Sequence, residues 1–176
     1  MTDEVDWAAW TVIMLKPECV TRNLVAPVLD VISASLTIVD CRTLVVTAAQ
    51  ILSHYSDLLT PPMLAYFTWV DVEADLRRHY VGHRIGISLA YGAHAAPRLR
   101  DLLGHYDPAH AAPTSIRGRF GQDSATRARA EHRLIDNLIH SSDDPDGAQH
   151  EFRIWYGPEN RHLLTPPLPP SNGETP

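Results

Sequence analysis

Apolar and polar positions follow strand-like and helix-like periods in turn along the chain. Residues 9–15 (AWTVIML) form an apolar run of strand-forming residues that stops at Lys16, which predicts a buried strand ending in a loop. Residues 23–34 place apolar side chains at helical spacing, and Asn23 is the expected N-cap. The same criteria predict strands over 36–46, 84–91 and 152–156, and helical segments over 48–59, 63–80, 96–103, 123–135 and 145–152.

These elements predict one domain, which we place at residues 1–163. Four strands with helices able to cover one face favour an α+β sandwich of the ferredoxin-like kind, with a four-stranded antiparallel sheet covered by helices. The polar stretch 105–121 is a long loop, and such loops in compact domains usually have a function. Residues 164–176 are rich in proline and are expected to form a flexible tail.

Composition agrees with an ordinary soluble globular protein. Hydrophobic residues make up 44% and charged residues 20% of the 176 positions, which excludes disordered and fibrous classes. The two cysteines, Cys19 and Cys41, form neither a disulfide framework nor a zinc pattern, so we expect reduced thiols. The first residues carry three acids before any base, and no apolar stretch is long enough to span a bilayer. We therefore expect a cytoplasmic protein that does not bind membranes.

The charges point to a local anion site rather than to nucleic acid. A formal charge of -6 argues against a nucleic-acid partner, because such proteins present a clustered basic excess. Lys16 is the single lysine among 15 basic residues, the other 14 being arginine. A compact ammonium is not interchangeable with a planar guanidinium, so a site that needs a small cation on a phosphate would resist replacement. A lysine that remains by chance on a solvated face is the alternative interpretation.

Two common phosphate-binding classes are excluded. No glycine precedes Lys16 in the run 10–15, so the chain has no P-loop. The glycine-rich loop and the His-Arg-Asp loop of protein kinases are also missing. A nucleotide would need another kind of site.

Five separated motifs supply that alternative, because together and in this order they resemble a nucleoside diphosphate kinase. The resemblance covers roughly residues 9–156. The motifs are Met14-Leu15-Lys16-Pro17-Glu18-Cys19-Val20, His54-Tyr55, Leu103-Gly104, Ser115-Ile116-Arg117-Gly118-Arg119-Phe120-Gly121 and Asn137-Leu138-Ile139-His140-Ser141-Ser142-Asp143.

The resemblance implies a ping-pong phosphotransferase in which a nucleoside triphosphate donates its γ-phosphate to His140 and a nucleoside diphosphate takes it back. Imidazole suits this role because its unprotonated nitrogen is available near neutral pH. Glu151 matches the glutamate that hydrogen-bonds the other ring nitrogen. Ser142 matches the hydroxyl beside the histidine, and Tyr55 is expected to steady that region.

The resemblance also implies nucleotide-binding residues. Lys16 would bind phosphate and a sugar hydroxyl, Arg100 and Arg117 the terminal phosphates, and Asn137 the sugar hydroxyl. Mg²⁺ carried by the nucleotide phosphates is implied by the family and by the chemistry of phosphoryl transfer. The chain itself is expected to offer no separate metal site. An assembly of identical chains is also expected.

Several positions depart from the family pattern. Met63 stands where the family has an aromatic residue stacking on the base, with Leu134 near the opposite wall of that slot. Tyr106 replaces a phosphate-binding threonine, Ser141 replaces the glycine after the histidine, and Asp144 is expected to add negative charge near the substrate. A diverged member, either with a different acceptor or without catalysis, therefore stays as the alternative function.

Compared with the family pattern, the chain has two insertions, around 64–80 and 121–133. The resemblance places them on the nucleotide entrance and in the loop that family members use in oligomer contacts. His79 and His83 are spaced for a metal on a helix, but with no third ligand indicated a solvated face is the favoured interpretation. The arginines of 121–133, Arg127, Arg129 and Arg133, are likewise interpreted as solvated helix charge.

Overall fold

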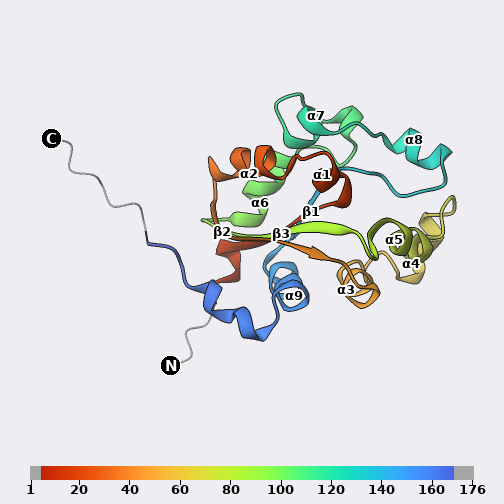
Figure 1. The fold of residues 1–176 in the computed structure, drawn as a ribbon. Coiled ribbons are helices and arrows are strands. Elements are labelled where there is room, and N and C mark those ends of the chain that lie inside the picture. Colours follow the sequence, from red (N-terminus) through yellow and green to blue (C-terminus); the bar gives the residue numbers. More distant parts are fainter. Residues whose placement is uncertain (1–4, 169–176) are drawn as a thin grey trace.

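The computed structural model describes residues 5–168, and a four-stranded sheet forms its centre (Figure 1). The strands lie in the order β2-β3-β1-β4, and every neighbouring pair is antiparallel. This confirms the predicted α+β class and its antiparallel sheet. The strands are β1 (Trp10–Leu15), β2 (Thr37–Val45), β3 (Arg84–Tyr91) and β4 (Ile139–Ser141).

Helices cover both faces of this sheet, whereas the sequence suggested one covered face. In Figure 1, α2 and α6 lie on one face and α3 and α9 on the other. The α-helices are α1 (Pro17–Thr21), α2 (Val25–Ser33), α3 (Ala48–His54), α4 (Pro61–Tyr66), α5 (Val72–Tyr80), α6 (Ala95–Leu103), α7 (Ile116–Phe120), α8 (Ala125–Ala130) and α9 (Pro145–Trp155). Short 3-10 helices span Trp7–Ala9, Pro108–His110 and Pro158–Leu164.

The central strand β1 shows why two covered faces are needed. All six of its residues are buried. Alternate side chains of a strand point to opposite faces, so Val12 and Met14 join one core and Ile13 and Leu15 the other. A continuous apolar run of this kind is typical of a strand buried on both sides.

The fourth strand is not the one expected from the sequence. The segment 152–156 (FRIWY) forms the end of α9 instead of a strand, and the strand that completes the sheet is β4. Phe152 and Trp155 are buried at helical spacing together with Ala148, which fixes the helical period. This correction matters for function, because β4 contains His140 and pairs it with Met14 of β1.

The remaining boundaries differ in detail. The predicted helix 63–80 is two helices, α4 and α5, separated by residues 67–71, and the loop 105–121 contains α7. Asn23 is not a cap: it has a φ of 55°, and Leu24 occupies the N-cap of α2. Leu164 is buried at the end of the last 3-10 helix, one residue past the predicted domain boundary. The rest of the predicted tail lies mainly in 169–176, outside the described residues.

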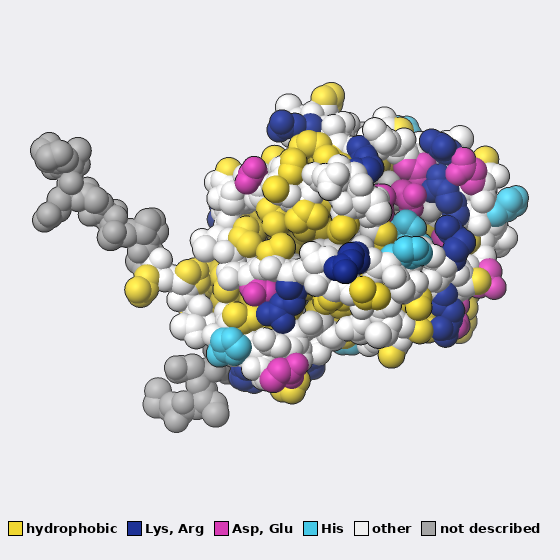
Figure 2. All heavy atoms as spheres, in the orientation of Figure 1, with side chains coloured by type: hydrophobic (Ala, Val, Ile, Leu, Met, Phe, Trp, Pro, Cys, Tyr) yellow, Lys and Arg dark blue, Asp and Glu magenta, His cyan; other side chains and the backbone are white. Residues whose placement is uncertain are grey.

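Charged side chains of both signs gather at one end of the molecule, over α5 and α8 (Figure 2). Within residues 5–168, no helix has the length and apolar character that a membrane crossing requires. Cys19 is buried and Cys41 exposed, and both are free thiols.

Candidate active site

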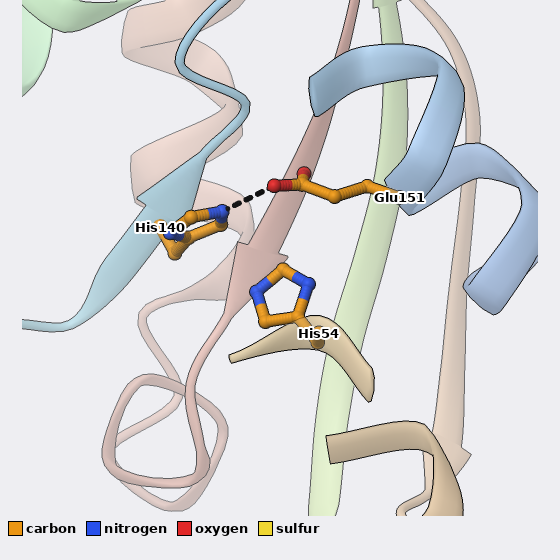
Figure 3. A group of neighbouring side chains, drawn as sticks. All are labelled: His54, His140 and Glu151. Atoms are coloured by element: carbon orange, nitrogen blue, oxygen red, sulfur yellow. Dashed lines mark hydrogen bonds and ion pairs between the residues drawn. The ribbon is translucent and has the colours of Figure 1, made fainter. Parts of the chain in front are cut away.

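His140 is held by a carboxylate from the helix that follows it. Its Nε2 lies 2.8 Å from Oε1 of Glu151 on α9 (Figure 3), and Ser142 donates its hydroxyl to the other carboxylate oxygen at 2.7 Å. A carboxylate accepts hydrogen bonds, so Nε2 of His140 is the donor in this contact, and in the neutral imidazole Nδ1 then carries the lone pair. The ring is therefore oriented as a nucleophile, and its side chain is 23% exposed.

A strained turn places the residues before His140. Leu138 has a φ of 69°, and the amide of Ile139 donates to the carbonyl of Asn137 at 2.8 Å. This three-residue turn with a positive φ is rare for a branched side chain and costs free energy. The backbone of Lys16 donates to the carbonyl of Leu138 at 2.9 Å, so the turn is bonded to the end of β1.

Lys16 and Arg117 provide positive charge near His140. Lys16 is only 8% exposed, and its Nζ donates to Oδ1 of Asn137 at 2.7 Å. Arg117 donates to the backbone carbonyls of Gly104, Asn137 and Ile139. Burial lowers the pKa of Arg117 from its ordinary value. Among residues 5–168 neither cation has a carboxylate within ion-pair distance, so both charges are available to an anion.

These groups open into a cavity of about 720 Å³, a size suited to a small ligand. Predicted site residues that line it are Lys16, Tyr55, Tyr106, Arg117, Leu134, Asn137 and His140. Met63 does not line it. Instead Tyr66, Phe67 and Trp69 form an aromatic wall on the cavity, and the assignment of Met63 to the base-stacking position stays a prediction. The signal for this wall was three aromatic residues within 66–69, after the Pro61-Pro62 break.

Tyr55 and Tyr106 reach the cavity in different ways. The hydroxyl of Tyr55 lies 3.2 Å from that of Tyr80, and its ring meets the ring of His140 edge-on at 5.8 Å between centroids. Tyr106 is 56% exposed, and its backbone carbonyl accepts from the side-chain amide of Asn137 at 2.9 Å.

Arg100 is not brought into the cavity. It is exposed and donates to Oδ1 of Asp143 at 2.6 Å. Two departures from the family pattern also lie outside the cavity. Ser141 is buried in β4, and Asp144 caps α9 by accepting from the amide of Gly147 at 2.7 Å. Asp144 therefore has a structural role at the start of α9, and its effect on the charge near the substrate stays a prediction.

The two insertions contact each other beside the cavity. The guanidinium of Arg129 lies 4.1 Å from the ring centroid of Trp69, and Nδ1 of His132 lies 2.9 Å from the Trp69 carbonyl oxygen. Arg133 makes a two-pronged ion pair with Asp123 at 2.6 and 2.9 Å. The sequence interpretation as solvated charge is wrong for Arg133, whose side chain is only 15% exposed, whereas Arg129 is exposed but also packs on the aromatic wall.

His79 is also not solvated, although His83 is exposed. Nε2 of His79 lies 3.1 Å from Glu18, and Nδ1 lies 3.6 Å from Asp136. Burial alone would raise the pKa of Glu18, but its hydrogen bond to His79 and the charge of Lys16 outweigh burial and lower it. The sequence did not indicate this cluster, because its members lie about 60 residues apart in the chain.

Within the described part of the chain, two groups of side chains place three ligand atoms within 4.8 Å of one another. One is Glu18, His79 and Asp136, and the other is His54, His140 and Glu151. In both groups an imidazole nitrogen already lies within hydrogen-bond distance of a carboxylate oxygen of the same group. The motif His54-Tyr55 was recognised in the sequence, but the proximity of His54 to His140 was not predicted from it.

Comparison with known proteins agrees with this fold. A solved nucleoside diphosphate kinase from Borrelia burgdorferi, with bound vanadate and ADP, matches with a TM-score of 0.76 and 25% identity over 86% of this chain and 88% of that chain. The Pyrobaculum aerophilum NDP kinase structure matches with a TM-score of 0.73 and 25% identity, covering 86% and 97% of the two chains.

Sequence comparison gives the same result. The nucleoside diphosphate kinase of Pyrobaculum aerophilum is 28% identical over 174 residues, covering 85% of this chain and 95% of its own. These relatives place the chain among the nucleotide phosphotransferases. The family model of nucleoside diphosphate kinase matches residues 9–161, most of the chain. The chain belongs to the nucleoside diphosphate kinase family.

Proposed function

We propose that this protein moves the γ-phosphate of a nucleoside triphosphate to a nucleoside diphosphate through a phosphohistidine at His140. The observation that carries the proposal is the placement of the His140 ring. Its Nε2 is hydrogen-bonded to Glu151, and the ring lines a cavity that Lys16 and Arg117 also line. A nucleophile beside two uncompensated cations is the arrangement that phosphoryl transfer needs, because catalysis is mostly positioning and neutralisation of phosphate charge.

The two half-reactions balance at phosphorus. In the first, the Nδ1 lone pair of His140 forms a bond to the γ-phosphorus, and the bond between that phosphorus and the bridging oxygen breaks. The nucleoside diphosphate leaves with the electron pair. In the second, a terminal oxygen of another diphosphate attacks the same phosphorus, and the phosphorus–nitrogen bond breaks. Glu151 keeps the Nε2 proton in place throughout, and Ser142 holds Glu151.

Cavity contacts suggest roles for the surrounding residues. Lys16 and Asn137, already bonded to each other, suit a phosphate and a sugar hydroxyl. Arg117 suits the transferred phosphate because it lines the same cavity as His140. Its guanidinium is held there by the carbonyls of Asn137 and Ile139. The base would lie against the aromatic wall of Tyr66, Phe67 and Trp69, with Leu134 also lining the space. The relative from Borrelia burgdorferi, which binds ADP, supports a nucleotide as the ligand.

Arg100 has a secondary place in this scheme. It is held by Asp143, three residues after His140, and a terminal phosphate would have to compete with that carboxylate. The nucleotide is proposed to enter as its magnesium complex, because Mg²⁺ prefers oxygen ligands and usually binds through phosphates. Among the described residues the carboxylates that line the cavity are Asp75 and Asp136, and both have basic neighbours. The ion would therefore be held mainly by the substrate.

We also propose that the chain works in the cytoplasm as an assembly of identical subunits. Both cysteines are free thiols, as is usual in reducing compartments. Strand β2 is an edge of the sheet with nine residues, and Val45 at its end is 51% exposed. An open edge of this length is a pairing surface that proteins usually cover. Light scattering coupled to size-exclusion chromatography would measure the number of subunits.

The direct test is incubation with γ-labelled ATP and Mg²⁺, followed by intact-mass and acid-lability analysis. Acid-labile label on the protein that is chased onto added nucleoside diphosphates is the expected result, and His140→Ala should take up none. Label that no nucleoside diphosphate can remove would point to a different acceptor. Binding of ATP without any label would indicate a non-catalytic module, and either result would overturn the proposal.

A further inference from the structure

His54 is a buried imidazole with one nitrogen that has no hydrogen-bond partner. It is the C-terminal residue of α3, and 6% of its surface is exposed. Its Nδ1 accepts from the indole N–H of Trp155 at 3.1 Å. Its Nε2 is one of the few buried side-chain polar atoms in residues 5–168 without a partner. Buried polar groups are nearly always satisfied, so this exception needs a cause.

The bond from Trp155 determines which nitrogen of His54 carries the proton. An indole N–H can only donate, so Nδ1 of His54 is unprotonated. Burial lowers the pKa of His54 well below its usual value, and the nearby His140 lowers it further, so the ring is neutral. A neutral ring with a bare Nδ1 has its proton on Nε2. The unpartnered atom is therefore an N–H donor.

This donor lies beside the ring of His140. The two ring centroids are 4.4 Å apart and the ring planes meet at 79°, an edge-to-face arrangement. Figure 3 shows a ring edge of His54 turned toward His140 and Glu151. The edge of an aromatic ring is its positive part and the face its negative part, so an N–H directed at a ring face is favourable.

We infer that His54 is a positioning residue for the phosphoryl transfer proposed above: its Nε2–H packs against the ring face of His140 and fixes the plane of that ring. Glu151 restrains His140 within the ring plane, through Nε2. His54 restrains it from above the plane. Rotation of the imidazole about its bond to the rest of the side chain would break both contacts, so Nδ1 keeps one direction in the cavity. Reacting groups held in one geometry gain rate, and small misplacements lose it.

Nuclear magnetic resonance tests the contact without reference to activity. A proton over a ring face is shielded, so the Hε2 resonance of His54 in the full-length protein should lie upfield of ordinary imidazole N–H resonances. In His140→Ala the resonance should return downfield. A His54 ring with a bare Nε2, or an Hε2 resonance that does not respond to His140→Ala, would overturn the inference. This result does not depend on whether the protein transfers phosphate.

Kinetics test the consequence. His54→Phe keeps a ring edge but has no N–H, and His54→Gln restores a donor and an acceptor. We expect phosphorylation of His140 to slow on the order of tenfold in His54→Phe, with nucleotide KM unchanged, and to recover in most part in His54→Gln. Equal rates in the wild type and both variants would contradict a positioning role. A higher KM together with a lower thermal stability in His54→Phe, without recovery in His54→Gln, would show that His54 is only a packing residue.

Discussion

Lys16 and Asn137 are joined side chain to side chain at 2.7 Å, although 121 residues separate them in the chain. The bond connects the end of β1 to the turn before β4, and Asn137 in turn donates to the backbone of Tyr106. Lys16 and Asn137 together therefore connect three segments of the cavity wall. The requirement for a compact cation that the sequence suggested at Lys16 has a physical basis in this contact.

Replacing Lys16 by Arg should remove most of the activity while retaining the charge. The guanidinium is longer and planar, and the 8% exposure of Lys16 leaves it little room beside Asn137. We expect phosphorylation of His140 to fall on the order of a hundredfold, as for a misplaced catalytic group. Labelled triphosphate in a rapid-quench experiment measures that rate. Arg153→Lys, the reverse exchange at an exposed position on α9, should be silent, and equal losses in both variants would argue against a special role for Lys16.

The aromatic wall predicts which residue holds the base. Stacking of a base on an aromatic side chain contributes about 1–3 kcal/mol, so Phe67→Ala should raise nucleotide KM roughly tenfold or more. Met63→Ala serves as the matched control, because Met63 lies in the same segment but does not line the cavity. Steady-state kinetics with several diphosphates give both values. A larger KM effect at Met63 than at Phe67 would restore the position expected from the family alignment.

Predictability from sequence varied with the length of each element. Strand β3 was predicted with both ends correct, because a long apolar run between turn residues has one simple interpretation. Strand β4 was missed because it has three residues and follows a turn at Leu138 that no local propensity favours. The segment 152–156 was misassigned because its aromatic and branched residues suit a strand locally, while burial of Ala148, Phe152 and Trp155 requires a helix.

Site prediction failed where distant segments meet. The resemblance to a known pattern paired His140 with Glu151, and the structure places these two side chains 2.8 Å apart, while the role of His140 as nucleophile stays a proposal. The insertions carried no such pattern, so the packing of Arg129 on Trp69 and the contact of His79 with Glu18 could not be anticipated. Contacts of this kind depend on tertiary placement and not on neighbouring residues.

Gly118 supports the position of Arg117. A Cβ at Gly118 would overlap the backbone carbonyl of Ala112, and backbone cannot move aside as a flexible side chain can. Gly118→Ala should therefore cost about 1–3 kcal/mol of folding free energy and shift α7, with a loss of activity. Gly82→Ala is the comparison, because that Cβ would meet open space and only its φ of 79° is unfavourable. Urea unfolding and turnover are measured together, and a larger loss of activity in Gly82→Ala would contradict this account.

The ion pair of Asp123 with Arg133 predicts how stability depends on pH. Burial alone would raise the pKa of Asp123, but the hydrogen bonds from Arg133 and from the amide of Asp136 outweigh burial and lower it. A carboxyl whose pKa is lower when folded stabilises the fold fully above its unfolded pKa of about 3.9. That stabilisation is lost as the pH falls through the folded value.

Asp123→Asn should therefore destabilise the protein at pH 7 by roughly 3 kcal/mol, because it leaves Arg133 largely buried without its main partner. The difference in unfolding free energy between wild type and variant should stay constant from pH 7 to about 5 and shrink below about 4, since the asparagine cannot titrate. Urea titrations across this range measure it. Glu131→Gln removes the exposed partner of the same arginine and should change little. A difference between wild type and Asp123→Asn that grows in acid would show that the carboxyl is not stabilised in its ionised form.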